Sequence, residues 1–335
     1  MAASASNPIY TVNIFHGNKK YDVTGLLIGL SMSESRNQIA KSVSLQISNV
    51  MVEGTWLSSV FKVRDRVCIF ADDGTKKEEV FRGFVWDRDY RSSISDREIS
   101  LKCYDHLIYL QKSESAEFFE EGKTTDDIIG TIFTEWGLEY EYSYESITHS
   151  KLALRGALSD IITTDILDIV KDRCGKKYVI LCEKDTIYIK TVGTNATVYK
   201  IAAGENAVST RSRNSMDGVV TKVVIYGKAD KQDRMPVDAT LSKNTAAYGT
   251  LQKIITRSEN ETIEDAKEEA QNILKENSTP KVTYEVQAPD IPWIRKGDKI
   301  YVNAGDISNK YLIVTDIERS ISSRGKKITL ELEDM

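Results

Sequence analysis

Apolar and polar residues alternate along most of the N-terminal third of the chain. Runs such as YTVNIF, KSVSLQISNV and FRGFVWDRDY place apolar side chains at alternate positions, and polar turns separate the runs. This alternation is typical of antiparallel strands with one buried face. About six or seven such strands are expected before residue 105, which is the number and spacing of a small barrel or sandwich.

Part of this pattern returns near the C-terminus. The first copy, residues 63–105, contains VRDRVCIF, EEVFRGFVWDRDY and REISLKCYD, and the second contains RKGDKIYV, KYLIVTDIERSI and KKITLELED. In this alignment Asp65 corresponds to Asp298, and Ile99 corresponds to Ile328. A chain that builds the same β-unit twice is expected to form a surface rather than an active site. Chance resemblance between two strand-rich segments is the alternative.

Between the two copies the pattern changes to a helical period. Thr124 and Asp127 are placed as a capping pair before an apolar helical face, and Gly137 follows as a C-terminal stop. A second helix is predicted over residues 164–174. Two alternating strands around Lys184-Asp185 then predict a hairpin.

These elements predict a fold that is mainly β with an α+β middle domain, in which two related small β-barrel domains are combined with helix-containing insertions. The expected domains are an N-terminal β-barrel at 8–112, an α+β domain (helix, helix, hairpin) at 113–200, and a second β-barrel at 201–335. The second barrel is expected to carry a polar, mobile arm at 228–247 and a helix at 262–277 that ends before a proline.

Composition and charge exclude several classes of function. Of the 335 residues, 41% are hydrophobic and 28% are charged, as in an ordinary globular protein. The net charge of −5 argues against specific or extensive binding of nucleic acid. The N-terminal run MAASASNPIY lacks the features of a secretory signal, and no apolar run approaches the ~18 residues of a membrane span. We therefore expect a soluble protein that is not exported by the general pathway and does not insert into membranes.

The four cysteines, Cys68, Cys103, Cys174 and Cys182, form no CxxC pair. Three of them lie in apolar strand patterns, so they are expected to be small buried hydrophobic residues rather than a disulfide framework. This usage fits assembly in a reducing cytoplasm.

Candidate catalytic groups are few. Cys103 and His106 point to opposite faces if the strand continues through both. The carboxylate pair Asp72-Asp73 lies in a turn, and the pair Asp126-Asp127 opens a helix, so both pairs have structural explanations. Metal-ligand spacings and phosphate-binding glycine loops are absent from the sequence. We therefore predict no catalytic, cofactor-binding or metal-binding residues, and no enzyme.

Tryptophans offer a second kind of candidate site. Trp56, Trp86 and Trp293 could line a groove for a sugar or a peptide. Packing is the favoured role, because Trp86 lies in an alternating run and Trp293 directly precedes a strand.

The run EEVFRGFVWDRDY followed by REISLKCYDHLIYLQKSE resembles the N-terminal domain of phage baseplate hub proteins. In that family an F-x-G-x-V strand is followed by a strand that ends in YD-x-L-x-YL. The runs TTDDIIGTIFTEWGL and LSDIITTDILDIVKDRCGKKYVILCEKDTIYIK are similar to the family's middle domain, and IEDAKEEAQNILKENSTP and IRKGDKIYV to its last domain. The resemblance extends over residues 10–335 and is to XkdQ-like (late control D-like) hubs of contractile phages, defective phages and phage-tail bacteriocins.

This resemblance implies a homotrimer at the centre of a contractile-tail baseplate. Two similar β-domains per subunit would alternate around the ring, so that three chains present six near-equivalent units. Such a ring is a symmetry adaptor between a six-fold tail tube and a three-fold spike. The implied partners are the tail tube protein, the central spike protein, other baseplate proteins and a tape-measure protein. Assembly would take place in the bacterial cytoplasm, and the particle is either a phage or a bacteriocin.

Two alternatives remain open. A tail-associated peptidoglycan hydrolase would need a convergent acid–base or metal site. A cell-wall-binding or receptor-binding module would need exposed tryptophans that gather into one groove.

Overall fold

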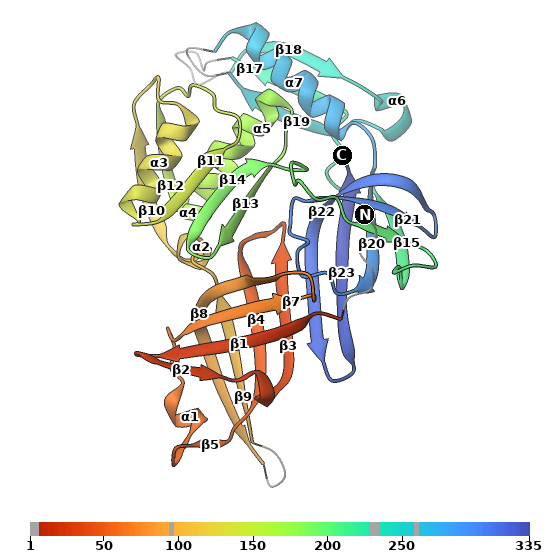
Figure 1. Ribbon diagram of the computed structural model, residues 1–335. Helices are drawn as coiled ribbons and strands as arrows, with labels where there is room; N and C mark the ends of the chain where they lie inside the picture. The colour runs from red at the N-terminus through yellow and green to blue at the C-terminus, as the bar shows by residue number, and fades with distance from the viewer. Residues whose placement is uncertain (1–6, 94–96, 228–234, 258–260) are drawn as a thin grey trace.

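The computed structural model describes residues 7–93, 97–227, 235–257 and 261–335. Strands dominate the fold, and Figure 1 shows a first β-unit in red to orange, a middle domain in yellow to green, a small layer with a long helix in cyan to light blue, and a second β-unit that is mostly blue, with β15 in green. The predicted fold class, mainly β with an α+β middle domain, is confirmed.

The first β-unit, residues 9–104, consists of seven main strands in the order β3-β4-β9-β8-β7-β1-β2. These strands are β1 (Ile9–His16), β2 (Lys19–Asp22), β3 (Leu27–Ser35), β4 (Gln38–Ser48), β7 (Arg66–Asp72), β8 (Lys77–Ser92) and β9 (Arg97–Tyr104). Short elements connect them: η1 (Thr24–Leu26), β5 (Met51–Val52), β6 (Thr55–Trp56) and α1 (Leu57–Val60). The predicted alternation in β4 is confirmed, because Val43, Leu45 and Ile47 are fully buried in the core of this unit.

The second β-unit, residues 200–215 and 281–334, has its own core. Its strands are β15 (Lys200–Ala202), β16 (Ser209–Ser215), β20 (Lys281–Pro289), β21 (Lys299–Ala304), β22 (Ile307–Ser322) and β23 (Gly325–Asp334). The order is β16-β20-β23-β22-β21, and β15 pairs parallel with β21.

The two β-units contain the same three-stranded antiparallel meander, as the repeat predicts. β7-β8-β9 corresponds to β21-β22-β23, and the middle strand has 16 residues in each. Each middle strand has a β-bulge against the third strand, between Val85 and Asp87 in the first unit and between Val314 and Asp316 in the second. Because the bulges fall at matching positions of the meander, Asp87 corresponds to Asp316.

The turn that opens the meander is repeated as well. The carboxylates of Asp65 and Asp298 each accept a hydrogen bond of 2.8 Å from the backbone N–H three residues earlier. Ile99 and Ile328 are both fully buried on the last strands of the two meanders, β9 and β23. The predicted alignment of the two copies is therefore confirmed.

The middle domain combines helices with two small sheets. Its elements are α2 (Leu107–Lys112), β10 (Glu114–Phe119), α3 (Thr125–Glu135), β11 (Glu139–Ser143), β12 (Leu152–Ala157), α4 (Leu158–Asp160), the π-helix η2 (Ile161–Leu167), α5 (Asp168–Cys174), β13 (Tyr178–Glu183) and β14 (Thr186–Thr191). Thr124 and Asp127 form the predicted capping box of α3. Gly137 and Gly175 both have the left-handed backbone expected after a helix, and the hairpin turns at Lys184-Asp185.

The second helix of this domain starts earlier than predicted. Helical residues begin at Leu158 rather than Thr164, and α4, η2 and α5 follow one another directly. Leu158, Ile161 and Ile162 are fully buried in the domain core, so burial extends the helix through a segment whose threonines favour other conformations.

The small layer consists of β17 (Lys222–Tyr226), β18 (Val237–Ser242), α6 (Thr245–Tyr248), β19 (Gln252–Thr256) and α7 (Ile263–Asn277). α7 begins after a Thr262–Asp265 capping box and covers the sheet β18-β17-β19, with which it forms a separate core. No helix of the described residues is long and apolar enough to cross a membrane.

The prediction of a mobile arm at 228–247 is wrong for residues 237–247. β18 pairs antiparallel with β17, and its Ala239 and Leu241 pack against the core beneath α7. Because β18 is an edge strand with one solvated face, its polar sequence is compatible with an ordered strand. Residues 228–234 lie outside the described part of the chain.

Candidate functional site

Cys103 and His106 have separate environments. Cys103 is fully buried in the core of the first β-unit, and burial raises the pKa of its thiol, so the reactive thiolate is disfavoured. His106 lies just before α2, with Nδ1 at 3.5 Å from a carboxylate oxygen of Asp185. Burial lowers the pKa of the imidazole, although Asp185 opposes the shift. No nucleophile–base pair is formed by these two residues.

The pair Asp72-Asp73 lies in the turn between β7 and β8. One carboxylate oxygen of Asp73 accepts hydrogen bonds from the backbone N–H groups of Thr75 and Lys76, each at 2.9 Å. The other oxygen accepts the indole N–H of Trp293 at 2.7 Å. Burial raises the pKa of Asp73, but hydrogen bonds from the Thr75 hydroxyl, the Trp293 indole and the two backbone N–H groups outweigh burial and hold the pKa well below its usual range. The predicted structural role in the turn is confirmed, and the carboxylate also ties the turn to the second half of the chain.

Asp126 and Asp127 lie in the first turn of α3, as predicted. Hydrogen bonds from Thr124 lower the pKa of Asp127, so its charge stabilises the start of the helix. Across the described ranges, His, Cys, Asp and Glu side chains form no group of three or more that could hold a metal ion.

The three tryptophans have individual packing partners. The guanidinium of Arg97 lies 4.7 Å from the ring centre of Trp56, and Trp86 contacts two tyrosine rings edge-on. Trp293 packs against the cores of both β-units, with the Lys76 ammonium 4.1 Å from its ring centre. The predicted packing role is confirmed for Trp293, which lies where the two units meet.

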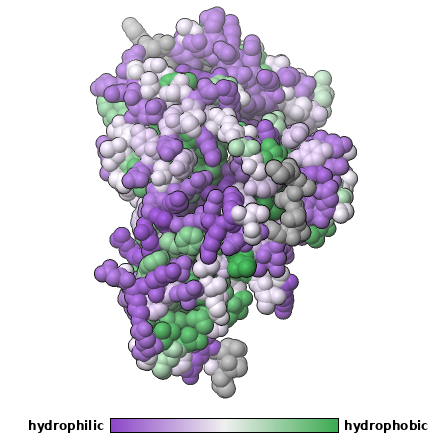
Figure 2. All heavy atoms as spheres, viewed as in Figure 1, coloured by the Kyte–Doolittle hydropathy of each residue, from purple (hydrophilic) through white to green (hydrophobic). Residues whose placement is uncertain are grey.

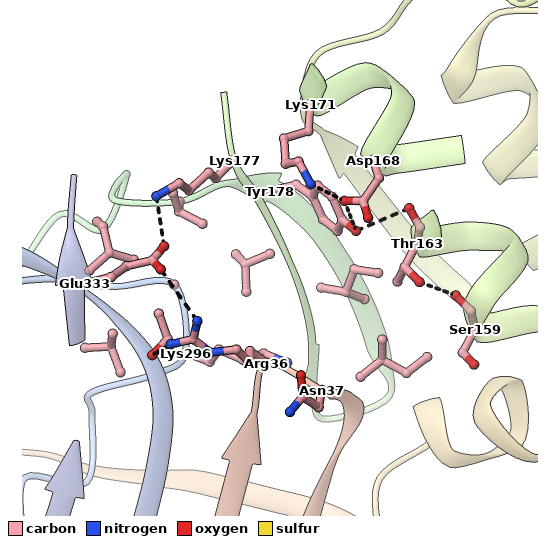
Figure 3. Close-up of a pocket in the computed structure, with 18 of the residues that line it drawn as sticks. Arg36, Asn37, Ser159, Thr163, Asp168, Lys171, Lys177, Tyr178, Lys296 and Glu333 are labelled. Carbon is pink, nitrogen blue, oxygen red and sulfur yellow. Dashed lines mark hydrogen bonds and ion pairs between the residues drawn. The ribbon is translucent and has the colours of Figure 1, made fainter. Parts of the chain in front are cut away.

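A cleft of about 370 Å³ lies where the two β-units meet the middle domain, and Figure 3 shows its polar lining. Several of its charged side chains form ion pairs: Lys171 lies 2.7 Å from Asp168, and Lys177 lies 2.9 Å from Glu333. The hydroxyl of Tyr178 donates to Asp168 at 3.2 Å, and burial raises the pKa of this tyrosine. The described residues that line the cleft include neither a cysteine nor a histidine. The cleft therefore offers polar contacts from hydroxyl, carboxylate and ammonium groups.

The two β-units are joined by direct strand pairing. Residues 317–322 of β22 pair antiparallel with residues 29–34 of β3, so both units share one sheet of 13 strands. At the end of this pairing, the hydroxyl of Ser35 donates to Asp316 at 2.7 Å. Backbone hydrogen bonds therefore fix the second unit on the first, and we call this contact the intrachain junction.

Buried charges lie beside the intrachain junction. Glu34 is only 3% exposed, and its carboxylate lies 3.1 Å from the ammonium of Lys41. The guanidinium groups of Arg295 and Arg319 lie 2.9 Å and 3.9 Å from the same carboxylate. Burial raises the pKa of Glu34, but Arg295, Lys41 and Arg319 together outweigh burial and hold the pKa well below its usual range. Burial lowers the pKa of Lys41 to about 8.

A second buried anion completes this cluster. Arg319 is 1% exposed, and its Nε lies 3.3 Å from Asp290. Its terminal nitrogen also donates to the backbone carbonyls of Ile291 and Pro292, at 3.3 Å and 3.4 Å. The hydroxyl of Tyr10, from the first unit, donates to Asp290. Because removing one partner from a buried ion pair leaves an uncompensated charge, this cluster disfavours separation of the units.

Sequence reasoning missed this cluster, although a signal was present. Leu30, Met32 and Glu34 share one face of β3, and Ile317 and Arg319 share one face of β22. A charge at a position whose alternation predicts burial indicates a buried ion pair.

Comparisons with known proteins agree with this architecture. The chain matches the family model described as YQBQ-like over residues 30–333. No curated protein sequence matches the chain.

Solved structures share the fold at low sequence identity. A tail protein from Neisseria meningitidis MC58 aligns with a TM-score of 0.70 and 13% identity, over 97% of this chain and 96% of that one. The 43 kDa tail protein of prophage MuSo2 from Shewanella oneidensis aligns with a TM-score of 0.68 and 14% identity, over 97% and 98%. The E. coli c3393 protein, described as a type VI secretion component structurally similar to the T4 tail proteins gp27 and gp5, aligns with a TM-score of 0.56 and 10% identity, over 92% and 73%.

The resemblance read from the sequence is therefore confirmed at the level of family and fold. The alignments with these two tail proteins extend over 97% of the present chain, and therefore over its duplicated β-meander, its middle α+β domain and the sheet that its two β-units share. The chain belongs to the YQBQ-like family and has the fold of phage tail proteins.

Proposed function

We propose that this chain is the structural baseplate hub of a contractile tail, a homotrimer that joins a six-fold tail tube to a three-fold central spike. The observation that carries the proposal is the internal duplication of strand, bulge and turn within one chain. Three copies of a chain with two near-equivalent units present six similar surfaces to the tube and keep three-fold symmetry towards the spike.

The way the two units are joined supports this role. The intrachain junction is made of backbone hydrogen bonds and a buried charge cluster, so the units hold a fixed relative position. A ring that must match a tube needs such rigid spacing, because flexible units would not present equivalent surfaces.

Surface properties support contacts with several partners. Figure 2 shows a mostly hydrophilic face on which apolar side chains gather at the lower end, over the first β-unit. Contiguous exposed apolar surface is a common feature of protein–protein contacts. The net charge of −5 is expected to leave the channel of the ring negative or neutral, so that DNA or a tape-measure protein passes through it without binding. The proposed partners are the tube protein, the spike protein, other baseplate proteins and the tape-measure protein, in a phage or bacteriocin particle assembled in the cytoplasm.

The likeness of the fold to c3393 supports the same proposal. That protein is described as similar to gp27 and gp5 of the T4 tail, and the present chain covers 73% of its length.

The test is the stoichiometry of the assembled baseplate. Native mass spectrometry of the chain with its tube and spike proteins is expected to give three copies per ring, and a monomer in dilute solution is compatible with assembly on partners. Six copies per baseplate, or one, would contradict the symmetry-adaptor function. A turbidity assay on purified cell walls tests the rival hydrolase, and clearing of the walls by the purified chain would favour that rival.

A further inference from the structure

The intrachain junction uses one edge of β22, and the corresponding edge of β8 is open. Both strands are the middle strands of corresponding meanders, so residues 317–321 of β22 correspond to residues 88–92 of β8. In the second unit this edge pairs with β3. Within the described ranges, no strand pairs with the same edge of β8 over residues 87–92.

The strand that would fill this edge also has a counterpart. β3 pairs antiparallel with β4, which pairs with the last meander strand β9. β16 pairs antiparallel with β20, which pairs with the last meander strand β23. β16 therefore corresponds to β3, with Ser215 at the position of Ser35. Its outer edge pairs with no strand in the part of the chain that the structure describes.

We propose that β8 of one copy pairs antiparallel with β16 of the next copy, which repeats the intrachain junction between chains. This inference rests on the proposed trimeric hub and names the surface that closes it. The open β8 edge of one chain would bind the open β16 edge of the next, so the contact is head-to-tail, and it generates a ring where the rotation between copies closes. Three intrachain and three interchain junctions then alternate around the ring.

The register follows from the intrachain junction. Glu318 pairs with Ser33 there, and the corresponding residues are Asp89 and Arg213, which have opposite charges. Asp316 accepts the hydroxyl of Ser35, and the corresponding residues are again an aspartate and a serine. Opposite charges that face each other directly stabilise a pair of strands, and this complementarity favours a second copy as the occupant of the open edge.

A second aspartate–serine contact is predicted by the same correspondence. In the proposed interchain junction, Asp87 occupies the position of Asp316, and Ser215 occupies the position of Ser35. The hydroxyl of Ser215 now donates to Asp217 at 2.8 Å, an exposed carboxylate next to the strand. This local bond is exposed to water, so its exchange for an intermolecular one costs little.

The proposed salt-bridge partners are accessible in the free chain. The side chain of Asp89 is 58% exposed and lies 3.2 Å from Arg91, and that of Arg213 is 66% exposed and lies 3.9 Å from Asp217. Exposed ion pairs of this kind contribute little to stability, so neither holds its residue away from a partner copy. Tyr90, 40% exposed beside Asp89, would be covered by the incoming strand.

Cysteine cross-linking of the full chain tests the pairing. Directly opposed residues on paired strands have Cα atoms about 4.5–5.5 Å apart, within disulfide reach. The variant Asp89→Cys/Arg213→Cys, oxidised as purified protein and in baseplates assembled with tube and spike proteins, is expected to give covalent dimers and trimers. Matched controls are each cysteine alone and the shifted pair Asp89→Cys/Arg211→Cys, whose Cα atoms would be about 7–8 Å apart. These controls are expected to show only the background of the native cysteines.

The outcomes separate this inference from the proposed function. If the chain is trimeric by mass but forms no cross-link, or cross-links only through the shifted pair, the proposed junction is wrong. The proposed hub function is not contradicted by that result. A chain that associates neither alone nor in baseplates overturns both. A covalent ladder larger than a trimer supports the strand junction and overturns the three-chain ring.

Charge exchange gives an independent readout of the same contact. Asp89→Arg places like charges opposite each other at three junctions, so the concentration for half-assembly is expected to rise about tenfold. Asp89→Arg combined with Arg213→Asp is expected to return it to within about twofold of the wild type. Equal weakening by the single and the double exchange would overturn the proposed register.

Discussion

Removal of the charge of Glu34 is a direct test of what holds the two β-units together. The substitution Glu34→Gln keeps the length of the side chain but removes the anion that Lys41, Arg295 and Arg319 share at 3.1, 2.9 and 3.9 Å. Loss of one partner from a buried ion pair costs about 3–5 kcal/mol, because the remaining charge stays buried without compensation. We expect the free energy of unfolding to fall by about this amount.

The pH dependence of this loss is predicted by Lys41. Burial already lowers the pKa of its ammonium to about 8, and Glu34 is the main group that opposes this shift. Without Glu34 the pKa falls further, so Lys41 in the folded variant releases its proton at lower pH. The destabilisation is therefore expected to be larger at about pH 6 than at about pH 9, where a neutral lysine needs no counter-ion.

Urea unfolding followed by tryptophan fluorescence is the assay, because Trp293 packs between the two units. The matched control is Glu318→Gln, which removes an exposed carboxylate from the intrachain junction itself. A change within about 0.5 kcal/mol is expected for this control. If Glu34→Gln destabilises the chain no more than Glu318→Gln, the buried charges do not hold the units together.

Two further predictions concern single buried positions. Burial raises the pKa of Asp105 to about 7 from 3.8, so the folded chain keeps a proton that the unfolded chain releases, and stability falls as pH rises through this interval. Asp105→Asn is expected to remove this pH dependence, which is measured as the difference in unfolding free energy between about pH 5 and about pH 8. An unchanged difference in the variant would show that Asp105 is not the group that titrates. Gly297→Ala is expected to cost about 2–4 kcal/mol in the same assay, because φ is +85° and the new Cβ would lie 2.8 Å from Val179. The control is Arg64→Ala, at the corresponding left-handed position of the first unit, where φ is 71°. This control should change the unfolding free energy by less than about 0.5 kcal/mol. Equal losses at both positions would show that the contact with Val179 is unimportant.

Local features of this fold were predictable from the sequence because local hydrogen bonds and periodic burial produce them. The capping box of Thr124 and Asp127, the left-handed Gly175 and the hairpin at Lys184 each involve residues close in sequence. The duplication was also visible, because both copies must bury the same face of the same meander. Corresponding turns such as those at Asp65 and Asp298 preserve this similarity in short motifs.

The error at β18 shows where local reading fails. Residues 237–242 are polar enough to resemble a loop, yet their strand is ordered by pairing with β17 and by contact with α7. Neither partner is adjacent in sequence, and an edge strand needs only one apolar face. Composition alone therefore could not distinguish this strand from an arm.

The intrachain junction was decided by tertiary structure alone. Pairing of β3 with β22 connects residues nearly 300 positions apart, and alternation predicts that each strand has a buried face but not which edge meets which. Glu34 and Arg319 lie on buried faces where a charge is costly, and only the folded chain supplies the opposite charges that make their burial possible. The sequence determined two similar β-units and their internal turns, whereas long-range backbone pairing and charge compensation decided how the units are joined.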